Sequence, residues 1–130
     1  MSTLLTPSEK VKNFFDNYGQ EDPVHDLFAA TAIWIEPGNS SISGKYCGPE
    51  SIMLLCKDVI ARSKDTFRIV EIVEIVEGEH YVLGIIIVEG ACDGRFIRTK
   101  DTLVFQFENN KAVEVRIISE DQNEVDTFWK

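Results

Sequence analysis

Residues 67–119 read FRIVEIVEIVEGEHYVLGIIIVEGACDGRFIRTKDTLVFQFENNKAVEVRIIS, and this stretch decides the fold. It is rich in β-branched residues, and short polar runs interrupt it at Glu77-Gly78-Glu79, at Asp93-Gly94 and at Asn109-Asn110. Such runs between β-rich segments are typical of hairpin turns. The stretch therefore predicts four consecutive antiparallel strands.

The first 31 residues predict two helices. Thr6-Pro7-Ser8-Glu9 has the capping-box pattern with a proline at the first helical position, so a helix begins there. We expect it to end near Tyr18, with Gly19 in the left-handed position. Asp22-Pro23 repeats the signal of a cap followed by proline and predicts a second helix that ends before Ala32.

The rest of the chain supplies one more strand and two more helices. Residues 32–36 are typical of a strand, and the Ser- and Gly-rich residues 39–48 predict a loop. Pro49-Glu50 opens a third helix, and residues 119–122 can cap a short final helix. Helices followed by a run of antiparallel strands indicate an α+β architecture, in which a curled sheet can enclose a cavity.

Composition excludes several classes of function. The formal net charge of −9 over 130 residues would repel nucleic acid and anionic membrane surfaces, and no apolar run approaches the roughly 20 residues of a membrane span. Residues 1–9 lack the pattern of a signal peptide, so we expect a cytoplasmic protein. Neither the three cysteines nor the two histidines have a metal-ligand spacing, and no phosphate-binding glycine loop is present, so we expect no metal and no cofactor. These five residues are Cys47, Cys56, Cys92, His25 and His80.

Three segments carry a family resemblance: Trp34-Ile35-Glu36-Pro37, the run from Gly44 to Glu50 (GKYCGPE), and the final Asp126-Thr127-Phe128-Trp129. Together with the order of elements, they resemble the NTF2-like superfamily, which includes ketosteroid isomerase and the SnoaL-type polyketide cyclases. The resemblance covers nearly the whole chain. It implies one domain over residues 1–130 with the cystatin-like cone, in which helices pack on a strongly curved antiparallel sheet that encloses a pocket.

The resemblance also implies site residues, though incompletely. Glu36 before Pro37 matches the general-base position of ketosteroid isomerase, whereas its two oxyanion-stabilising residues fall near Phe14 and Leu103, which are apolar. An enolate-like transition state would lack stabilisation here, so we do not expect steroid isomerisation. The acid/base aspartate of the cyclases matches Glu120 or Asp121 within one residue, and their strand histidine is missing.

Side-chain alternation gives an independent prediction of what faces the pocket. Asp101 shares the apolar face of its strand with Thr99, Leu103, Phe105 and Phe107, and it can alternatively reach water or pair with Lys100 or Arg98. On the next strand, Val113, Val115 and Ile117 complete the apolar wall. Glu71 and Glu74 are three residues apart and would face opposite sides of a regular strand, so a β-bulge between them is favoured.

Alternation leaves the orientation of residues 33–36 open, and the family resemblance places Trp34 and Glu36 inside. Desolvation would then raise the pKa of Glu36 and make it a better base; the alternative is a solvated carboxylate at the rim. Tyr46 either caps the pocket mouth or is an exposed loop residue, and Tyr18 and Trp34 can also be plain core residues. The candidate catalytic residues are Glu36 and Asp101. The candidate ligand-binding residues are Phe14, Tyr18, Trp34, Tyr46, Leu103, Phe105 and Ile117.

Two functions compete at this point. The first is a binding protein or enzyme for a small apolar or amphipathic molecule, of isomerase or cyclase type, in which a pocket carboxylate transfers a proton. The second is a non-catalytic accessory or docking module with the same fold. Residues 81–89 are apolar on both faces of their strand, and family members commonly pair sheet to sheet, so we also expect a homodimer.

Overall fold

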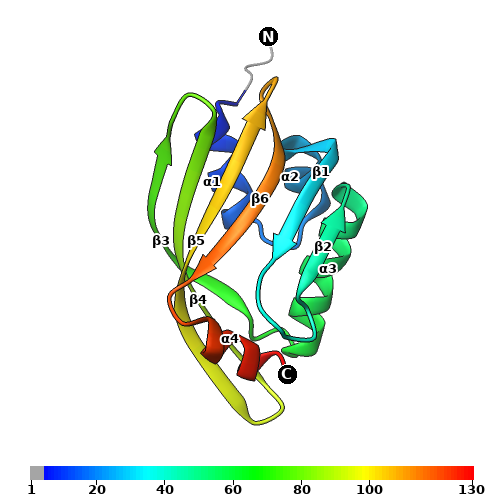
Figure 1. Cartoon of the computed structure of the whole chain (residues 1–130), viewed down its shortest axis with the longest axis vertical. Coiled ribbons are helices and arrows are strands. Elements are labelled where there is room, and N and C mark those ends of the chain that lie inside the picture. The colour runs from blue at the N-terminus through cyan, green and yellow to red at the C-terminus, as the bar shows by residue number, and fades with distance from the viewer. Residues whose placement is uncertain (1–4) are drawn as a thin grey trace.

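The computed structural model describes residues 5–130, so the first four residues of the segment examined for an export signal lie outside the described residues. Within residues 5–130, four helices and six strands follow one another (Figure 1). In order they are α1 (Pro7–Asp16), α2 (Glu21–Leu27), β1 (Phe28–Glu36), β2 (Gly44–Cys47), α3 (Pro49–Arg62), β3 (Arg68–Glu77), β4 (Tyr81–Cys92), β5 (Arg95–Glu108), β6 (Lys111–Ser119) and α4 (Gln122–Phe128).

The strands form one sheet in the order β2-β1-β6-β5-β4-β3. The four consecutive strands β3 to β6 pair antiparallel, as the three turn signals predicted. The sheet as a whole is mixed, because β1 pairs parallel with β6, and this differs from the antiparallel sheet that we expected. The two strands meet in parallel because α3 and the four strands β2 to β5 separate them along the chain and return β6 beside β1 in the same direction.

The helix starts follow the predicted caps with one exception. The Thr6 hydroxyl accepts a hydrogen bond from the Glu9 amide at 3.1 Å, and the Glu9 carboxylate accepts one from the Thr6 amide at 2.8 Å. The cap of α2 is Gln20 rather than Asp22, which lies in the first turn. β1 also begins earlier than predicted, at Phe28, because the chain turns from helix to extended backbone at that residue without a linker.

The predicted loop over residues 39–48 contains a strand. Ser40 and Ser43 close a turn, in which the Ser40 amide donates to the Ser43 hydroxyl at 2.8 Å and the Ser43 amide donates to the Ser40 carbonyl at 3.2 Å. β2 then runs back along β1, so that Tyr46 pairs with Trp34. Its four residues are mostly exposed and lack apolar alternation, and for this reason the sequence pattern did not reveal the strand.

Two irregularities bend the sheet. The β3–β4 register shifts between Ile69 and Glu71 and again between Ile72 and Glu74, so both glutamates are exposed and the predicted bulge is confirmed. A further shift on β5–β6 pairs Phe107 with Ala112.

The register shift between β5 and β6 changes which β6 residues face inward, and this differs from the prediction. Ala112 is fully buried, whereas Val113, which we expected to face inward, is only half-buried. One extra residue in a strand reverses the alternation beyond it, so the inward set on β6 changes at this point.

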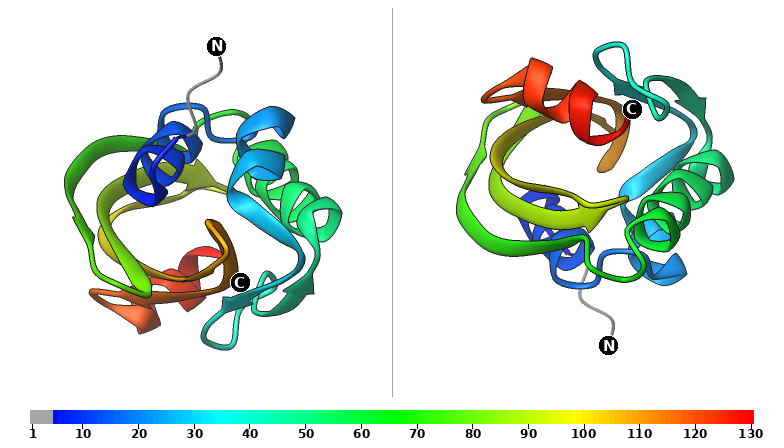
Figure 2. Two further views of the ribbon diagram at one scale, coloured as in Figure 1. Left: turned by 90° about the horizontal axis from the view of Figure 1, so that it is seen from above. Right: turned by 90° about the horizontal axis from the view of Figure 1, so that it is seen from below.

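The bent sheet curls around an interior that α1 and α3 cover, and α4 lies at the end opposite α1 (Figure 2). Gly84 on β4 permits a close approach, because a Cβ at this position would lie 2.6 Å from Cε2 of Phe15 on α1. The largest fully buried side chains include Phe14, Phe105 and Phe128, which come from α1, β5 and α4. None of the helices in the described part of the chain is long and apolar enough to cross a membrane.

Candidate functional site

A cavity of about 70 Å³ lies between the concave face of the sheet, α1, α3 and α4. Most of its wall is apolar, and its polar groups are two carboxyls, two hydroxyls on β5 and β6, the Tyr18 phenol and the indoles of Trp34 and Trp129. The residues that line it are Phe14, Phe15, Tyr18, Trp34, Glu36, Ile42, Leu55, Val59, Phe67, Ile69, Ile86, Val88, Ile97, Thr99, Asp101, Leu103, Ile117, Ser119, Val125 and Trp129.

Glu36 is the last residue of β1 and faces this cavity together with Trp34, two residues before it. The Trp34 Nε1–H donates a hydrogen bond of 3.0 Å to Oε1 of Glu36. Burial raises the pKa of the Glu36 carboxyl to about 7, with a smaller contribution from the charge of Asp101, while the bond from Trp34 acts in the opposite direction. A carboxyl with this pKa exchanges protons readily at neutral pH.

Asp101 reaches the same cavity from β5, where its Cα pairs with that of Ser119 on β6. Its Oδ1 atom is buried and has no hydrogen-bond partner among the described residues. Burial raises the pKa of Asp101 to about 6, and the Ser119 hydroxyl partly offsets this effect. A buried acceptor without a partner costs free energy, which a ligand donor or a bound proton can recover.

Two further titratable groups lie beside this carboxyl pair. Burial raises the pKa of the Tyr18 phenol well above its ordinary value, and the neighbouring thiol of Cys56 and charge of Glu36 act in the same direction. Burial also raises the pKa of Cys56, to about 12. Both groups are therefore neutral at physiological pH, and Tyr18 can act only as a hydrogen-bonding group on the cavity wall.

Aromatic rings form a continuous band along the cavity. The Phe14 ring lies edge-on to Trp34 at a centroid distance of 6.1 Å and to Tyr18 at 5.8 Å. Tyr18 contacts Phe67 at 5.7 Å, and Phe67 contacts Trp129 at 6.1 Å. Such contacts fix the rings relative to one another. The band therefore extends from α1 to the end of the chain as one packed unit.

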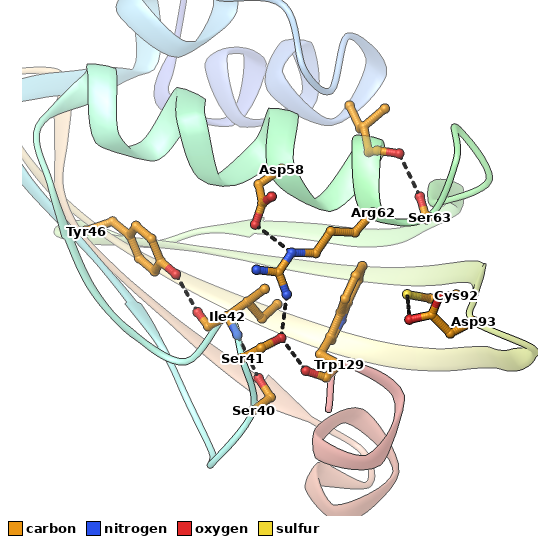
Figure 3. Close-up of polar contacts among 11 residues, drawn as sticks. Ser40, Ser41, Ile42, Tyr46, Asp58, Arg62, Ser63, Cys92, Asp93 and Trp129 are labelled. Carbon is orange, nitrogen blue, oxygen red and sulfur yellow. Dashed lines mark hydrogen bonds and ion pairs between the residues drawn. The ribbon is translucent and has the colours of Figure 1, made fainter.

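The C-terminal end of the chain closes one side of the cavity through a set of polar contacts that we call the Ser41 latch (Figure 3). The Ser41 amide donates to the Trp129 carbonyl at 2.9 Å, and the Ser41 hydroxyl donates to the same oxygen. Arg62 on α3 donates to the Ser41 hydroxyl at 2.6 Å and pairs with Asp58 at 3.0 Å. The latch thus joins α3, the turn before β2 and the segment after α4.

The structure brings most of the predicted site residues together. Those that line the cavity are Glu36, Asp101, Phe14, Tyr18, Trp34, Leu103 and Ile117. The four other carboxylates that we considered are exposed and lie outside it: Glu71, Glu74, Glu120 and Asp121. Asp121 instead caps α4, where its side chain accepts from the Glu124 amide at 3.1 Å.

Two predicted ligand-binding residues are not part of the cavity wall. Phe105 is fully buried and packs against the rings of Phe15 and Phe28, at centroid distances of 6.0 and 6.4 Å. Phe15, which contacts Phe105, lines the cavity instead, and strand alternation alone does not reveal such a contact. Tyr46 is half-buried, and its hydroxyl donates to the Ile42 carbonyl at 2.6 Å, so it braces the turn before β2.

Sequence reasoning missed several wall residues. Ile42 comes from the predicted loop, Ser119 from a strand end, and Val125 and Trp129 from the final helix and its cap. Val125 and Trp129 are apolar and buried, but only the fold places them at the cavity. Within residues 5–130, no group of three or more potential metal-ligating side chains lies together.

No protein-family model matches this sequence, and no curated protein matches it either. Solved structures do match its fold. A protein of unknown function with a cystatin-like fold from Xanthomonas campestris is 23% identical, with a TM-score of 0.87, over 96% of this chain and 98% of that one. An NTF2-like protein from Burkholderia xenovorans LB400 is 18% identical, with a TM-score of 0.79, over 98% and 100% of the two chains.

A third structure, TerC co-crystallized with polyporic acid, is 16% identical, with a TM-score of 0.76, and the match covers 95% of this chain and 98% of TerC. All three matches cover nearly the whole of both chains. At sequence identities this low, they establish a shared fold and nothing more. They confirm the predicted α+β cone. The chain therefore has the NTF2-like, or cystatin-like, fold.

Proposed function

We propose that the cavity binds a small organic molecule and transfers a proton on it, with Glu36 as the base and Asp101 as its acidic partner. The observation that carries this proposal is the convergence of two carboxyls on one aromatic cavity, where the Asp101 Oδ1 atom has no partner. Such a pair titrates as a unit and holds one proton over an intermediate range of pH. One carboxylate then accepts a proton while the other carboxylic acid donates a hydrogen bond.

The assignment of the base follows from the pKa values. Glu36, with a pKa of about 7, is the stronger base of the two, and it is still close to half ionised at neutral pH. Because the pKa of Asp101, about 6, is the lower of the two, the shared proton lies on Glu36 in most molecules, and the reactive form is the minor one in which the proton lies on Asp101 and Glu36 is ionised. For a carbonyl compound, Glu36 would remove a proton from the adjacent carbon, and the Asp101 hydroxyl would donate a hydrogen bond to the carbonyl oxygen. Glu36 would then return the proton to a different atom of the enol.

The fold supports the binding part of this proposal. TerC, a structural neighbour over nearly its whole length, has been co-crystallized with the organic compound polyporic acid. We infer that the cavity of this chain likewise accepts an organic ligand. A cavity of about 70 Å³ limits that ligand to a few heavy atoms unless the walls move.

Deuterium exchange at the carbon next to the carbonyl of cyclopentanone, followed by NMR, tests proton transfer without knowledge of the natural substrate. We expect the protein to accelerate exchange in heavy water at pD 7.5 by about 10²-fold over an equal concentration of acetate. Glu36→Gln should remove this acceleration, because the amide cannot accept the proton. Glu50→Gln, on an exposed acid in the first turn of α3, should leave it unchanged. Full activity of Glu36→Gln would contradict the assignment of the base.

One observation favours the second function, a non-catalytic accessory or docking module. The cavity is small for a ligand site, because aromatic side chains from several elements crowd its wall. If this function is the correct one, cyclopentanone exchange stays at the acetate level in the unchanged protein. Replacing Trp129, which lines the cavity, should then leave partner binding through the outer surface intact.

A further inference from the structure

We propose that the ligand of this cavity is a small organic cation, an ammonium group that carries few carbons, held by Glu36, Asp101 and the surrounding aromatic rings. This inference rests on the proposed binding function of the same cavity and names the class of its ligand.

The first argument is charge. The cavity wall contains two carboxyls and no lysine, arginine or histidine among residues 5–130. Two basic side chains near the interior are engaged elsewhere: Lys10 Nζ donates to the Asn110 carbonyl at 2.6 Å, and Arg62 belongs to the Ser41 latch. Buried carboxylates are normally paired with a cation or a metal. The structure therefore holds a negative site that its own residues leave without a counter-charge.

The second argument is the unpaired acceptor. The Asp101 Oδ1 atom is buried without a hydrogen-bond partner, and one oxygen of Glu36 is engaged only by the Trp34 indole. The negative charge of Asp101 also raises the pKa of Glu36, which means that the two groups repel each other when both are ionised. A cation between them relieves this repulsion, whether or not it also carries an N–H that donates to Oδ1. A neutral ligand can donate to Oδ1 but leaves the repulsion between the two carboxylates in place.

The third argument is the ring composition of the wall. Six aromatic side chains line the cavity, among them two tryptophans: Phe14, Phe15, Tyr18, Trp34, Phe67 and Trp129. A ring face attracts a cation within about 6 Å of its centroid, most strongly for tryptophan. In a cavity of about 70 Å³, a bound group lies within that range of several rings at once. Rings also replace the weak hydration of an alkylated ammonium at little cost, so such a cation can enter where a metal ion would not.

The test compares two probes of equal size, tetramethylammonium and neutral tert-butanol, by titration of amide NMR signals at pH 8. We expect tetramethylammonium to bind at least about tenfold more tightly than tert-butanol. Its shifts should be concentrated at cavity residues such as Trp34, Thr99 and Trp129. Tighter binding of tert-butanol would overturn the proposal. The proposal would also be overturned if tetramethylammonium changed only the NMR signals of residues on the acidic outer surface.

The variant Glu36→Gln/Asp101→Asn keeps the shape of both side chains and removes their charge. It should lose most of the affinity for tetramethylammonium and keep that for tert-butanol, which also shows that the cavity is intact. The matched control Glu50→Gln/Glu120→Gln removes two exposed charges and should bind tetramethylammonium as the unchanged protein does. Equal loss of affinity in the control and in the cavity variant would contradict the proposal.

The pH dependence adds a second readout. Besides Asp101, the titratable groups that interact electrostatically with Glu36 are Tyr18 after α1, Cys56 on α3 and Tyr46 on β2, and burial raises the pKa of each, so they stay neutral. Of these groups, only the two cavity carboxyls become protonated between pH 8 and pH 5. The affinity for tetramethylammonium should therefore fall by about tenfold or more, while that for tert-butanol stays constant. A tetramethylammonium affinity that is flat over this range would contradict the proposal.

The outcomes separate this inference from the proposed proton transfer. Binding of tetramethylammonium without cyclopentanone exchange would retain the cation site and reject the catalytic base. Deuterium exchange in cyclopentanone without selective binding of tetramethylammonium would retain Glu36 as the base and reject an organic cation as the ligand.

Discussion

Glu36 and Asp101 bind protons more tightly in the folded protein than in the unfolded chain, because burial disfavours their charged forms. For Glu36, the folded pKa of about 7 exceeds the ordinary value of 4.5. Between these values the folded state carries more protons, so the free energy of unfolding decreases as the pH rises through this window. The destabilisation is complete above pH 7 and vanishes below about pH 4.5.

This linkage predicts the effect of Glu36→Gln on stability. At pH 8 the substitution should raise the free energy of unfolding by about 1–3 kcal/mol, because the amide avoids the cost of burying a charge and can still accept from Trp34. At pH 5 most of this gain should disappear. Urea unfolding at the two pH values measures the difference. A gain that is equal at both would show that the carboxyl is solvated.

For single residues, the sequence predicted the direction in which a side chain points better than it predicted which neighbour that side chain contacts. Alternation along β5 correctly placed Asp101 and Leu103 on the inner face, and the resemblance placed Glu36 there. Phe105 shares that face but is covered by Phe15, and Tyr46 bonds the Ile42 carbonyl. Both errors arise because the sequence pattern gives the direction of a side chain and not the neighbour that reaches it first.

Among the elements, α1 and β4 are in closest contact at Gly84, where a Cβ would lie 2.6 Å from the Phe15 ring. Gly84→Ala should therefore lower the free energy of unfolding by about 1–3 kcal/mol, since α1 or the Phe15 ring must move. Gly78→Ala is the matched control, because its Cβ would meet the Tyr81 carbonyl at an ordinary 3.4 Å. Thermal and urea unfolding of the two variants test this. Equal effects would argue against a tight contact.

The Ser41 latch makes a second prediction at this scale. Ser41→Ala removes the hydroxyl that joins Arg62 to the Trp129 carbonyl but retains the backbone bond to that carbonyl. We expect a loss of about 1 kcal/mol in the stability of α4. Amide hydrogen exchange at residues 125–130 should accelerate about fivefold, while Thr127→Ala, on an exposed residue of α4, should not change it. Unchanged exchange in Ser41→Ala would show that the side chain contributes nothing to the latch.

The elements that the sequence predicted are those with strong local signals. The capping box of α1, the proline that opens α3 and the turns between β3, β4, β5 and β6 are all present. β2 was missed because four exposed residues carry no periodicity, and their strand conformation depends on pairing with β1. The bulge in β3 was predictable because a regular strand would have buried a glutamate.

For the whole molecule, the outer face of the sheet supports the expected homodimer. Leu83, Ile85 and Ile87 on β4 are half-buried there, and Ile118 on β6 is 61% exposed. We predict a dimer at micromolar concentration by sedimentation, because pairing of two such faces buries this apolar surface. Ile85→Glu should yield monomers, and Leu54→Glu, at an exposed site on α3, should not. A monomeric mass for the unchanged protein would refute the dimer.

The central claim is that two carboxyls share one apolar cavity, and NMR titration of the Glu36 and Asp101 side-chain carboxyl carbons tests it most directly. We predict that this pair titrates with apparent pKa values of about 7 and about 6, and that each signal also responds to the ionisation of the other residue. Addition of tetramethylammonium should lower both values. If both carboxyls instead titrate independently near their ordinary values of 4.5 and 3.8, they are solvated, and the proposed site does not exist.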